Sequence, residues 1–294
     1  MSTTGQILDL NAGWRTTCAS VSGQVQCFGW NLNGQLGIGP IDDQYSPRVV
    51  SEPLASKSTS YIKPGVVHSC ALTGSEEMYC WGSNISVSIG IGEDLDYSFV
   101  PVKLTQAFLP NVNAVEQITV GRAHTCAIVL LNDDEHKFWC WGANEYGMLG
   151  DDSRNPSDNP VEVLSVDANH VVQIEAGYLH TCAILSNDMD AASSLWCWGL
   201  NFSGQLGIGS NLNAYIPQQV FFGDIKHVSS SYYHTCAVKD DLCYCWGDNE
   251  NGQLGIGSTV NQNTPQLVTT GGPVQTVVAG ATHTCALLFS GSLE

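Results

Sequence analysis

The stretch Ala176–Gly209, AGYLHTCAILSNDMDAASSLWCWGLNFSGQLGIG, decides the fold of this chain, because its landmarks occur five or six times. Its first cysteine, Cys182, belongs to a Gly-x-x-His-Thr-Cys-Ala run, and its second, Cys197, opens a Cys-Trp-Gly triplet that leads to Gly-Gln-Leu-Gly. The first cysteine recurs at spacings of 52, 56, 56, 54 and 49 residues, at Cys18, Cys70, Cys126, Cys182, Cys236 and Cys285. Self-similarity with a period of about 50 residues is typical of a propeller or a related repeat array.

Each repeat predicts short β-strands rather than helices. Around Cys182, alternate residues face opposite sides of a strand, so that His180, Cys182 and Ile184 share one face. Thirty glycines and eleven prolines punctuate the 294-residue chain, which suits strands and tight turns. Four short strands per repeat correspond to one antiparallel blade, so we predict an all-β propeller as a single domain over residues 1–294. The predicted repeat units are 7–58, 59–112, 113–169, 170–223, 224–272 and a partial unit, 273–294.

The repeated residues also carry a family resemblance. Gly-x-x-His-Thr-Cys-Ala, followed by Cys-Trp-Gly-x-Asn-x-x-Gly-Gln-Leu-Gly, resembles the repeat of the RCC1 (regulator of chromosome condensation) family, here in a cysteine-rich variant. The resemblance covers essentially the whole chain and implies a β-propeller, usually of seven blades. Some units depart from the pattern: Thr16 replaces the first histidine, and Val87-Ser88-Ile89-Gly90 replaces Gly-Gln-Leu-Gly in the second unit.

The sixth repeat is partial. Residues 290–294 align with residues 22–26, and the residue after 26 is Cys27, so a Cys-Trp-Gly triplet is the next expected feature. We therefore expect five near-complete blades and a partial sixth. This arrangement would be an open or truncated propeller, with a parent protein of six or seven blades.

Ten of the twelve cysteines fall into five pairs, one in each complete repeat. Both members of a pair flank a predicted hairpin, where opposed residues have Cα atoms about 4.5–5.5 Å apart, within disulfide range. The alternative is that these cysteines are small buried apolar residues without a bond. We favour disulfides. Cys243 and Cys285 then lie outside the five pairs. The predicted pairs are Cys18 with Cys27, Cys70 with Cys80, Cys126 with Cys140, Cys182 with Cys197, and Cys236 with Cys245.

Disulfides form and persist in oxidising compartments. The pairing therefore predicts an extracellular or cell-surface protein, with the cytoplasm as the alternative.

The composition argues against several classes of function. Ten Lys and Arg against 28 Asp and Glu give a net charge of −18, which repels nucleic-acid phosphate and anionic membrane surfaces. No run of eighteen apolar residues is present, so membrane insertion is not expected. No nucleophile elbow, phosphate loop or dinucleotide fingerprint occurs. We predict no enzymatic activity, no catalytic residue and no cofactor.

The recurring histidines invite a metal or catalytic interpretation. They occur once per repeat, so a propeller would spread them around a ring rather than gather them. We assign them, with the threonine that follows, to hydrogen bonds within or between blades, and we predict no metal site. The recurring tryptophans have an apolar body suited to packing between blades, with the indole N–H on a carbonyl.

One pair of positions varies inside the fixed motif, namely the two residues between glycine and histidine. Equivalent positions of a propeller meet around one face, and aromatic side chains with arginine have the composition of a binding hot spot. The alternative is that these side chains only plug the inner channel mouth. The long loops 41–60, 131–137, 151–159 and 186–194 are a second candidate surface. The partner-binding candidates are Trp14, Arg15, Arg122, Tyr178, Tyr232 and Tyr233.

These patterns favour a non-enzymatic protein-binding scaffold that uses a propeller face or its loops. Its expected partner is another protein, or neighbouring domains of a longer chain. The alternative implied by the resemblance is a guanine-nucleotide exchange factor or regulatory domain for a small GTPase, although the chain lacks the basic tail expected for chromatin binding. Relatives that sense ultraviolet light use Gly-Trp-Arg-His-Thr runs. Only residues 13–17 approach that run, so a photoreceptor is not favoured.

Overall fold

The computed structural model describes residues 5–92, 95–105, 108–186 and 192–294. The chain divides into two compact units. The first comprises residues 1–143 with 156–161, and the second comprises residues 144–155 with 162–294. Each unit has its own antiparallel sheets and its own apolar core.

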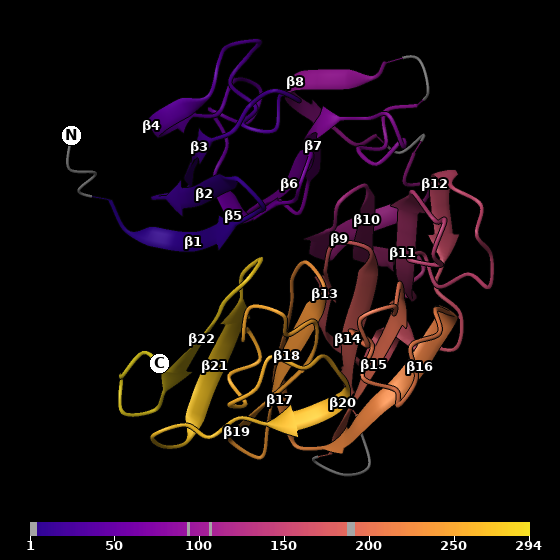
Figure 1. Ribbon diagram of the computed structural model, residues 1–294. Helices are drawn as coiled ribbons and strands as arrows, with labels where there is room; N and C mark the ends of the chain where they lie inside the picture. Colours follow the sequence, from indigo (N-terminus) through magenta and orange to yellow (C-terminus); the bar gives the residue numbers. More distant parts are fainter. Residues whose placement is uncertain (1–4, 93–94, 106–107, 187–191) are drawn as a thin grey trace. The chain divides into compact units, whose positions relative to one another are not determined.

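The first unit contains three four-stranded sheets, in each of which consecutive strands are neighbours (Figure 1). Glu162, the last residue of the twelfth strand, belongs to the second unit. The strands are β1 (Ile7–Ala12), β2 (Thr16–Val21), β3 (Gln24–Gly29), β4 (Gln44–Val49), β5 (Thr59–Pro64), β6 (His68–Thr73), β7 (Met78–Ser83), β8 (Tyr97–Lys103), β9 (Val112–Val120), β10 (His124–Leu131), β11 (His136–Gly142) and β12 (Ser157–Glu162).

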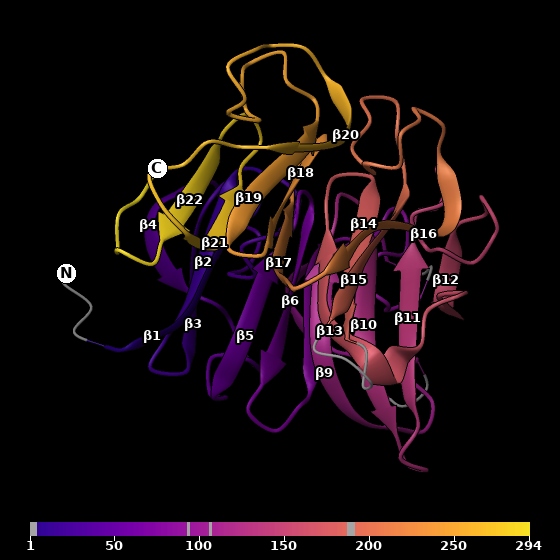
Figure 2. The same ribbon diagram turned by 90° about the horizontal axis from the view of Figure 1, so that it is seen from below.

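The second unit contains two four-stranded sheets and one two-stranded sheet. Figure 2 shows β21 of the two-stranded sheet beside β17. A 3-10 helix, Ala168–His170, precedes the first of these sheets. The strands are β13 (Val171–Ala176), β14 (His180–Ser186), β15 (Ser193–Gly199), β16 (Ala214–Gly223), β17 (Ile225–Ser230), β18 (His234–Lys239), β19 (Leu242–Gly247), β20 (Gln262–Leu267), β21 (Val274–Ala279) and β22 (Thr284–Leu288).

The sheets confirm the prediction of an all-β propeller with five complete blades and a partial sixth. Each predicted repeat unit contains one sheet, except that β9 begins one residue early, at Val112. The grouping of residues 1–294 into a single domain stays a prediction, because the structure describes two units.

Each blade carries a turn that is locked by a buried asparagine. In the fourth blade the Asn201 side-chain oxygen accepts a hydrogen bond from the Leu206 N–H at 2.9 Å. Its amide group donates to the carbonyls of Ser210 and Leu212. Leu206 is fully buried, so the turn is held against the blade core. The same bond joins Asn31 to Leu36, Asn84 to Ile89, Asn144 to Leu149, and Asn249 to Leu254.

Neighbouring blades within a unit are joined through one main-chain carbonyl in this turn. The Gln205 carbonyl accepts hydrogen bonds from Thr235 Oγ1 and Trp246 Nε1 of the next blade, both at 2.9 Å. Gly207 follows at φ 71°, and a Cβ there would lie 2.6 Å from Trp246 Nε1, so the turn requires glycine. Equivalent pairs are Ser69 and Trp81 on Gln35, Thr125 and Trp141 on Ser88, and Thr181 and Trp198 on Met148.

The four tryptophans of these pairs are fully buried. This confirms the predicted packing between blades with the indole N–H on a carbonyl. Because a buried carbonyl and a buried N–H each need a partner, the pairing fixes the position of the indole as well as burying its apolar body.

We predict that Trp198→Phe lowers the free energy of unfolding by about 1–2 kcal/mol, because it removes a buried donor and part of a buried ring. Trp196→Phe is the matched control on the same strand. Trp196 is half-buried, and its indole N–H bonds only to the Ser194 hydroxyl. Urea unfolding followed by circular dichroism measures both, and equal losses in the two variants would contradict the role given to the Met148 carbonyl.

Candidate functional site

The five predicted cysteine pairs are disulfides. In each blade the two cysteines occupy directly opposed positions of the second and third strands, as Cys182 on β14 and Cys197 on β15 do. The Cα atoms are 4.1–4.2 Å apart in the five pairs. The prediction from hairpin spacing is therefore confirmed. Each disulfide ties two strands of one blade, whereas the tryptophans and threonines tie one blade to the next.

Two cysteines are free. Cys243 on β19 is only 1% exposed, and its sulfur lies 3.9 Å from the sulfur of Cys245. Burial raises the pKa of the Cys243 thiol to about 11. At neutral pH the thiol is therefore protonated and packs as an apolar side chain. Cys285 on β22 is half-buried.

The recurring histidines bond to the next blade rather than form a reactive cluster. His68 Nε2 lies 2.8 Å from Thr125 Oγ1, and that hydroxyl donates its only proton to the Ser88 carbonyl. The hydroxyl must therefore accept from the imidazole, which fixes a proton on Nε2. The predicted role in hydrogen bonds between blades is confirmed for three pairs, namely His68 with Thr125, His180 with Thr235, and His234 with Thr284.

Burial keeps the imidazoles of His68, His124 and His234 neutral. Loss of hydration lowers the pKa of His68 to about 3, with a smaller contribution from the neighbouring His124. It lowers the pKa of His124 and of His234 to about 4. Rings this hard to protonate are poor general acids or bases at neutral pH. Their role is structural, in the hydrogen bonds between blades.

In the second unit, the variable positions gather into an aromatic cluster. Tyr178 lies between β13 and β14, and Tyr232 and Tyr233 lie between β17 and β18. The ring centroids of Tyr178 and Tyr232 are 4.1 Å apart, and those of Tyr178 and Tyr233 are 5.5 Å apart. Phe202 adds a fourth ring, 5.0 Å from Tyr233 and 55% exposed. We call these four residues the tyrosine cluster.

Main-chain hydrogen bonds hold the turns that carry the tyrosine cluster. The Tyr178 N–H donates to the Ser231 carbonyl at 2.9 Å, which links the equivalent turns of two blades. Phe202 occupies a variable position of the Asn-x-x-Gly turn. Phe202 was not among the predicted candidates, because the cluster joins two different parts of the repeat.

In the first unit, the candidates Trp14 and Arg15 form a separate group. The Trp14 ring packs edge-on against Trp30, with centroids 5.7 Å apart. The guanidinium carbon of Arg15 lies 4.2 Å from the centroid of Trp14, within cation–π range. One face of Trp14 is therefore covered by a cation of its own chain.

The remaining candidates are less defined. Arg122 is exposed between β9 and β10. Of the candidate loops, 131–137 is largely a hairpin turn joining β10 to β11, and 41–60 contains β4. Residues 187–191 of loop 186–194 lie outside the described residues. A partner-binding role for all six candidate residues stays a prediction.

Within the described residues, no group of three or more His, Cys, Asp or Glu side chains is placed to hold a metal ion. Over the same part of the chain, no helix has the length and apolar character needed to cross a membrane.

Four-stranded antiparallel blades, joined by indoles from Cys-Trp-Gly strands, define a β-propeller of repeated sequence motifs. The model of the Regulator of chromosome condensation (RCC1) repeat matches residues 22–72, 75–128, 135–184, 193–238 and 240–287. The chain belongs to the RCC1 repeat family.

The proteins whose sequences are similar to this chain are named for different functions. The chain is 30% identical over 224 residues to the ultraviolet-B receptor UVR8 of Arabidopsis thaliana, covering 75% of this chain and 48% of the receptor. It is 30% identical over 217 residues to the probable E3 ubiquitin-protein ligase HERC3 of Homo sapiens, covering 73% of this chain and 19% of the ligase. The chain thus spans about half, or less, of these curated relatives.

Among solved structures, yeast RCC1 (Prp20) bound to Kap60 superposes with a TM-score of 0.80 and 20% identity. The alignment covers 98% of this chain and 69% of Prp20. At this identity the likeness shows the RCC1 propeller fold.

We predict that the protein loses stability as the pH falls below the ordinary histidine pKa. The unfolded chain binds protons below about pH 6.5, whereas native His68 and His234 stay neutral until the pH passes their lowered values of about 3 and about 4. Stability is therefore full above about pH 6.5 and declines below it, by about 2 kcal/mol per buried histidine between about pH 7.5 and pH 5.

The urea midpoint, measured at several pH values across this range, gives the slope of stability against pH. Because pH 5 lies above the pKa of ordinary carboxyl groups, these groups contribute little to that slope. His234→Gln keeps an N–H donor but does not titrate, so it should flatten the slope. A slope unchanged by this variant would contradict the assignment.

We predict two reactive thiols per molecule after denaturation without reduction, Cys243 and Cys285. In the native protein Cys285 should react first, since Cys243 is buried and its pKa is raised. Alkylation mapped by mass spectrometry measures both states. Twelve reactive cysteines in the denatured, unreduced protein would show that the disulfides are absent.

Proposed function

We propose that this protein is a non-enzymatic, protein-binding scaffold and that the tyrosine cluster is the centre of its binding surface. The observation that carries the proposal is the gathering of Tyr178, Tyr232, Tyr233 and Phe202 from three separate turns. Tyrosine side chains supply large, rigid contact area with a polar tip, and they are enriched at binding hot spots.

The surroundings of the cluster favour a cationic partner segment. The Asp248 N–H donates to the Tyr233 carbonyl at 2.8 Å, so an acidic residue is bonded to the main chain of the cluster, while its carboxylate accepts from the Gln253 side-chain amide. Aromatic faces attract Lys and Arg side chains, and the exposed ring of Phe202 offers such a face beside the half-buried tyrosines. The net charge of −18 would also steer a basic partner toward the protein.

The names of the relatives are compatible with a binding role. Yeast RCC1 (Prp20) is described as bound to Kap60, so that protein takes part in a complex with another protein. HERC3 is named a probable ligase, but this chain spans only 19% of it. The ligase name therefore adds no activity to the proposal.

We place the scaffold outside the cell or on its surface. The five disulfides support this, because such bonds persist in oxidising compartments. The alternative is a cytoplasmic protein that regulates a small GTPase. Fully reduced cysteines in protein taken from its native compartment would favour that alternative.

The test compares the wild-type chain with a Tyr232→Ala/Tyr233→Ala variant as baits for proximity labelling in the native compartment, followed by titration against each enriched protein. We expect the double variant to bind at least about tenfold more weakly, because two hot-spot rings are removed. Tyr45→Ala is the matched control, since Tyr45 is 96% exposed and lies in the first unit.

Unchanged affinity of the double variant, with native circular dichroism, would overturn the role of the cluster. A nucleotide-release assay against a panel of GDP-loaded small GTPases examines the alternative. Accelerated release by the wild-type chain would replace the scaffold proposal with an exchange factor.

A further inference from the structure

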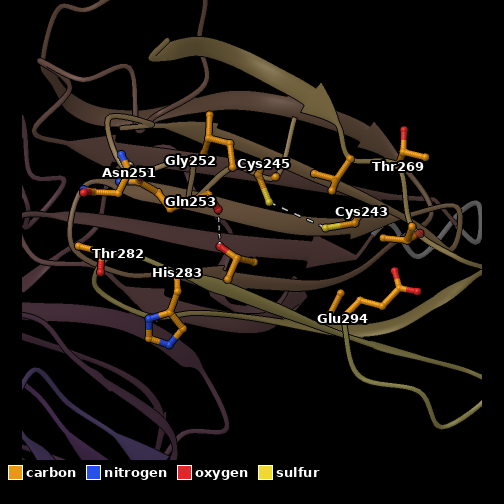
Figure 3. Close-up of a pocket in the computed structure, with 15 residues that line it drawn as sticks. Cys243, Cys245, Asn251, Gly252, Gln253, Thr269, Thr282, His283 and Glu294 are labelled. Atoms are coloured by element: carbon orange, nitrogen blue, oxygen red, sulfur yellow. Dashed lines mark hydrogen bonds between the residues drawn. The ribbon is translucent and has the colours of Figure 1, made fainter. Parts of the chain in front are cut away.

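The fifth disulfide differs from the other four, because the sulfur of a third cysteine touches it. Cys236 on β18 is bonded to Cys245 on β19, and the free thiol of Cys243 lies two residues before Cys245. The sulfurs of Cys243 and Cys245 are 3.9 Å apart, and Figure 3 shows them at the wall of a pocket of about 390 Å³ beside Gln253. At this distance the thiol is in direct contact with the disulfide.

Strand alternation explains the contact. Residues two apart on a strand face the same side, so Cys243 and Cys245 both belong to the core of the fifth blade, which includes Val238 and Leu254. In the fifth blade the position two before the second cysteine is 1% exposed and carries the thiol of Cys243. In the other four blades the same position holds a buried apolar residue, namely Val25, Met78, Phe138 and Leu195.

The sheet geometry allows this thiol one of two conceivable new bonds. A strand rises about 3.2–3.4 Å per residue, which places the Cα atoms of Cys243 and Cys245 about 6.4–6.8 Å apart, within the disulfide range of about 4.4–6.8 Å. Cys236 is opposed to Cys245 and therefore stands diagonally from Cys243. Diagonal neighbours have Cα atoms about 7–8 Å apart, so exchange in the intact sheet joins Cys243 to Cys245 and not to Cys236.

A hydrogen-bond acceptor is in place for the cysteine that such an exchange releases. The sulfur of Cys236 lies 3.7 Å from the hydroxyl oxygen of Thr284. That hydroxyl donates its proton to the Gln253 carbonyl and accepts from Nε2 of His234. A hydroxyl oxygen has two lone pairs, so one is left to accept the S–H of a released Cys236.

We propose that Cys243 exchanges with the fifth disulfide and makes the hairpin of β18 and β19 a switch that needs no external oxidant or reductant. Cys243 loses its proton to water, and its thiolate attacks the sulfur of Cys245. The Cys243–Cys245 bond forms, the Cys236–Cys245 bond breaks, and Cys236 leaves as a thiolate that takes up a proton from water. The hairpin thereby changes from cross-linked to open. The first four blades carry no free cysteine among the described residues, so their hairpins stay cross-linked.

Thiol mapping on the full 294-residue protein tests the exchange. Because burial raises the pKa of Cys243 to about 11, the oxidised protein is held at about pH 8.5, near the ordinary cysteine pKa, without oxidant or reductant. Mild acid then stops the exchange by removing thiolate, and maleimide labelling in denaturant followed by peptic digestion and mass spectrometry locates the free thiols. We expect the label on Cys236 to rise at least about tenfold, since the reacting sulfurs are already in contact, while the label on Cys243 falls by the matching amount.

Cys243→Val is the matched control, because valine holds the equivalent position of the first blade. This variant should keep the native circular dichroism and leave Cys236 unlabelled. A second variant, Cys236→Ser, examines whether the product bond can form in the folded blade. With oxidised glutathione, which is reduced to two molecules of glutathione as the bond forms, this variant should gain the Cys243–Cys245 disulfide and keep its native circular dichroism.

Three outcomes would overturn the proposal. If Cys236 stays unlabelled in the wild type, or if Cys243 and Cys245 stay unbridged in the Cys236→Ser variant, the thiol is only an apolar core residue. A label on Cys236 that persists in Cys243→Val would make Cys285 the exchanging thiol. Equal labelling of the cysteines from the other four disulfides would show general scrambling rather than a switch in the fifth blade. All of these measurements locate thiols, so their result is independent of the binding role proposed for the tyrosine cluster.

Discussion

One main-chain carbonyl in each Asn-x-x-Gly-x-Leu-Gly turn is the joint on which the described blades depend. Gln205 illustrates it: its oxygen accepts from a threonine hydroxyl and from an indole N–H of the next blade. The asparagine at the start of the turn fixes where the carbonyl points, and the closing glycine leaves room for the indole. Because buried polar groups must be paired, these residue types are required together. The motif recurs as a block for this reason.

The joint also explains why the chemistry of the repeat is structural. The histidine adds a third member to the same hydrogen-bonded chain, since His234 donates to Thr284, which in turn donates to the Gln253 carbonyl. With its proton fixed and its pKa lowered by burial to about 4, this imidazole is committed to the contact between blades. The binding surface proposed above uses side chains that take no part in the joint. These are the rings of the tyrosine cluster, held in place by turns whose main chains are already hydrogen-bonded.

Disulfides stabilise the single blades, and interblade hydrogen bonds stabilise the contacts between neighbouring blades. Each disulfide closes a short hairpin within a blade and therefore constrains the unfolded chain locally. The hydrogen bonds between blades join residues 30 to 57 positions apart, and they form only when two blades meet. In such arrays each blade contributes to the stability of its neighbours.

The sequence by itself determined the blades, the five disulfides and the role of the tryptophans. These follow from local rules, since strand alternation and hairpin spacing place Cys182 opposite Cys197 whatever the rest of the chain does. It also identified Tyr178, Tyr232 and Tyr233 as candidates, because they vary inside a fixed motif. Only the tertiary structure decided that Phe202 joins them, that Arg15 covers Trp14, and that a pocket lies beside Gln253. Each of these depends on how side chains from separate turns pack against one another. The spacing of residues along the chain does not encode the distances between those side chains.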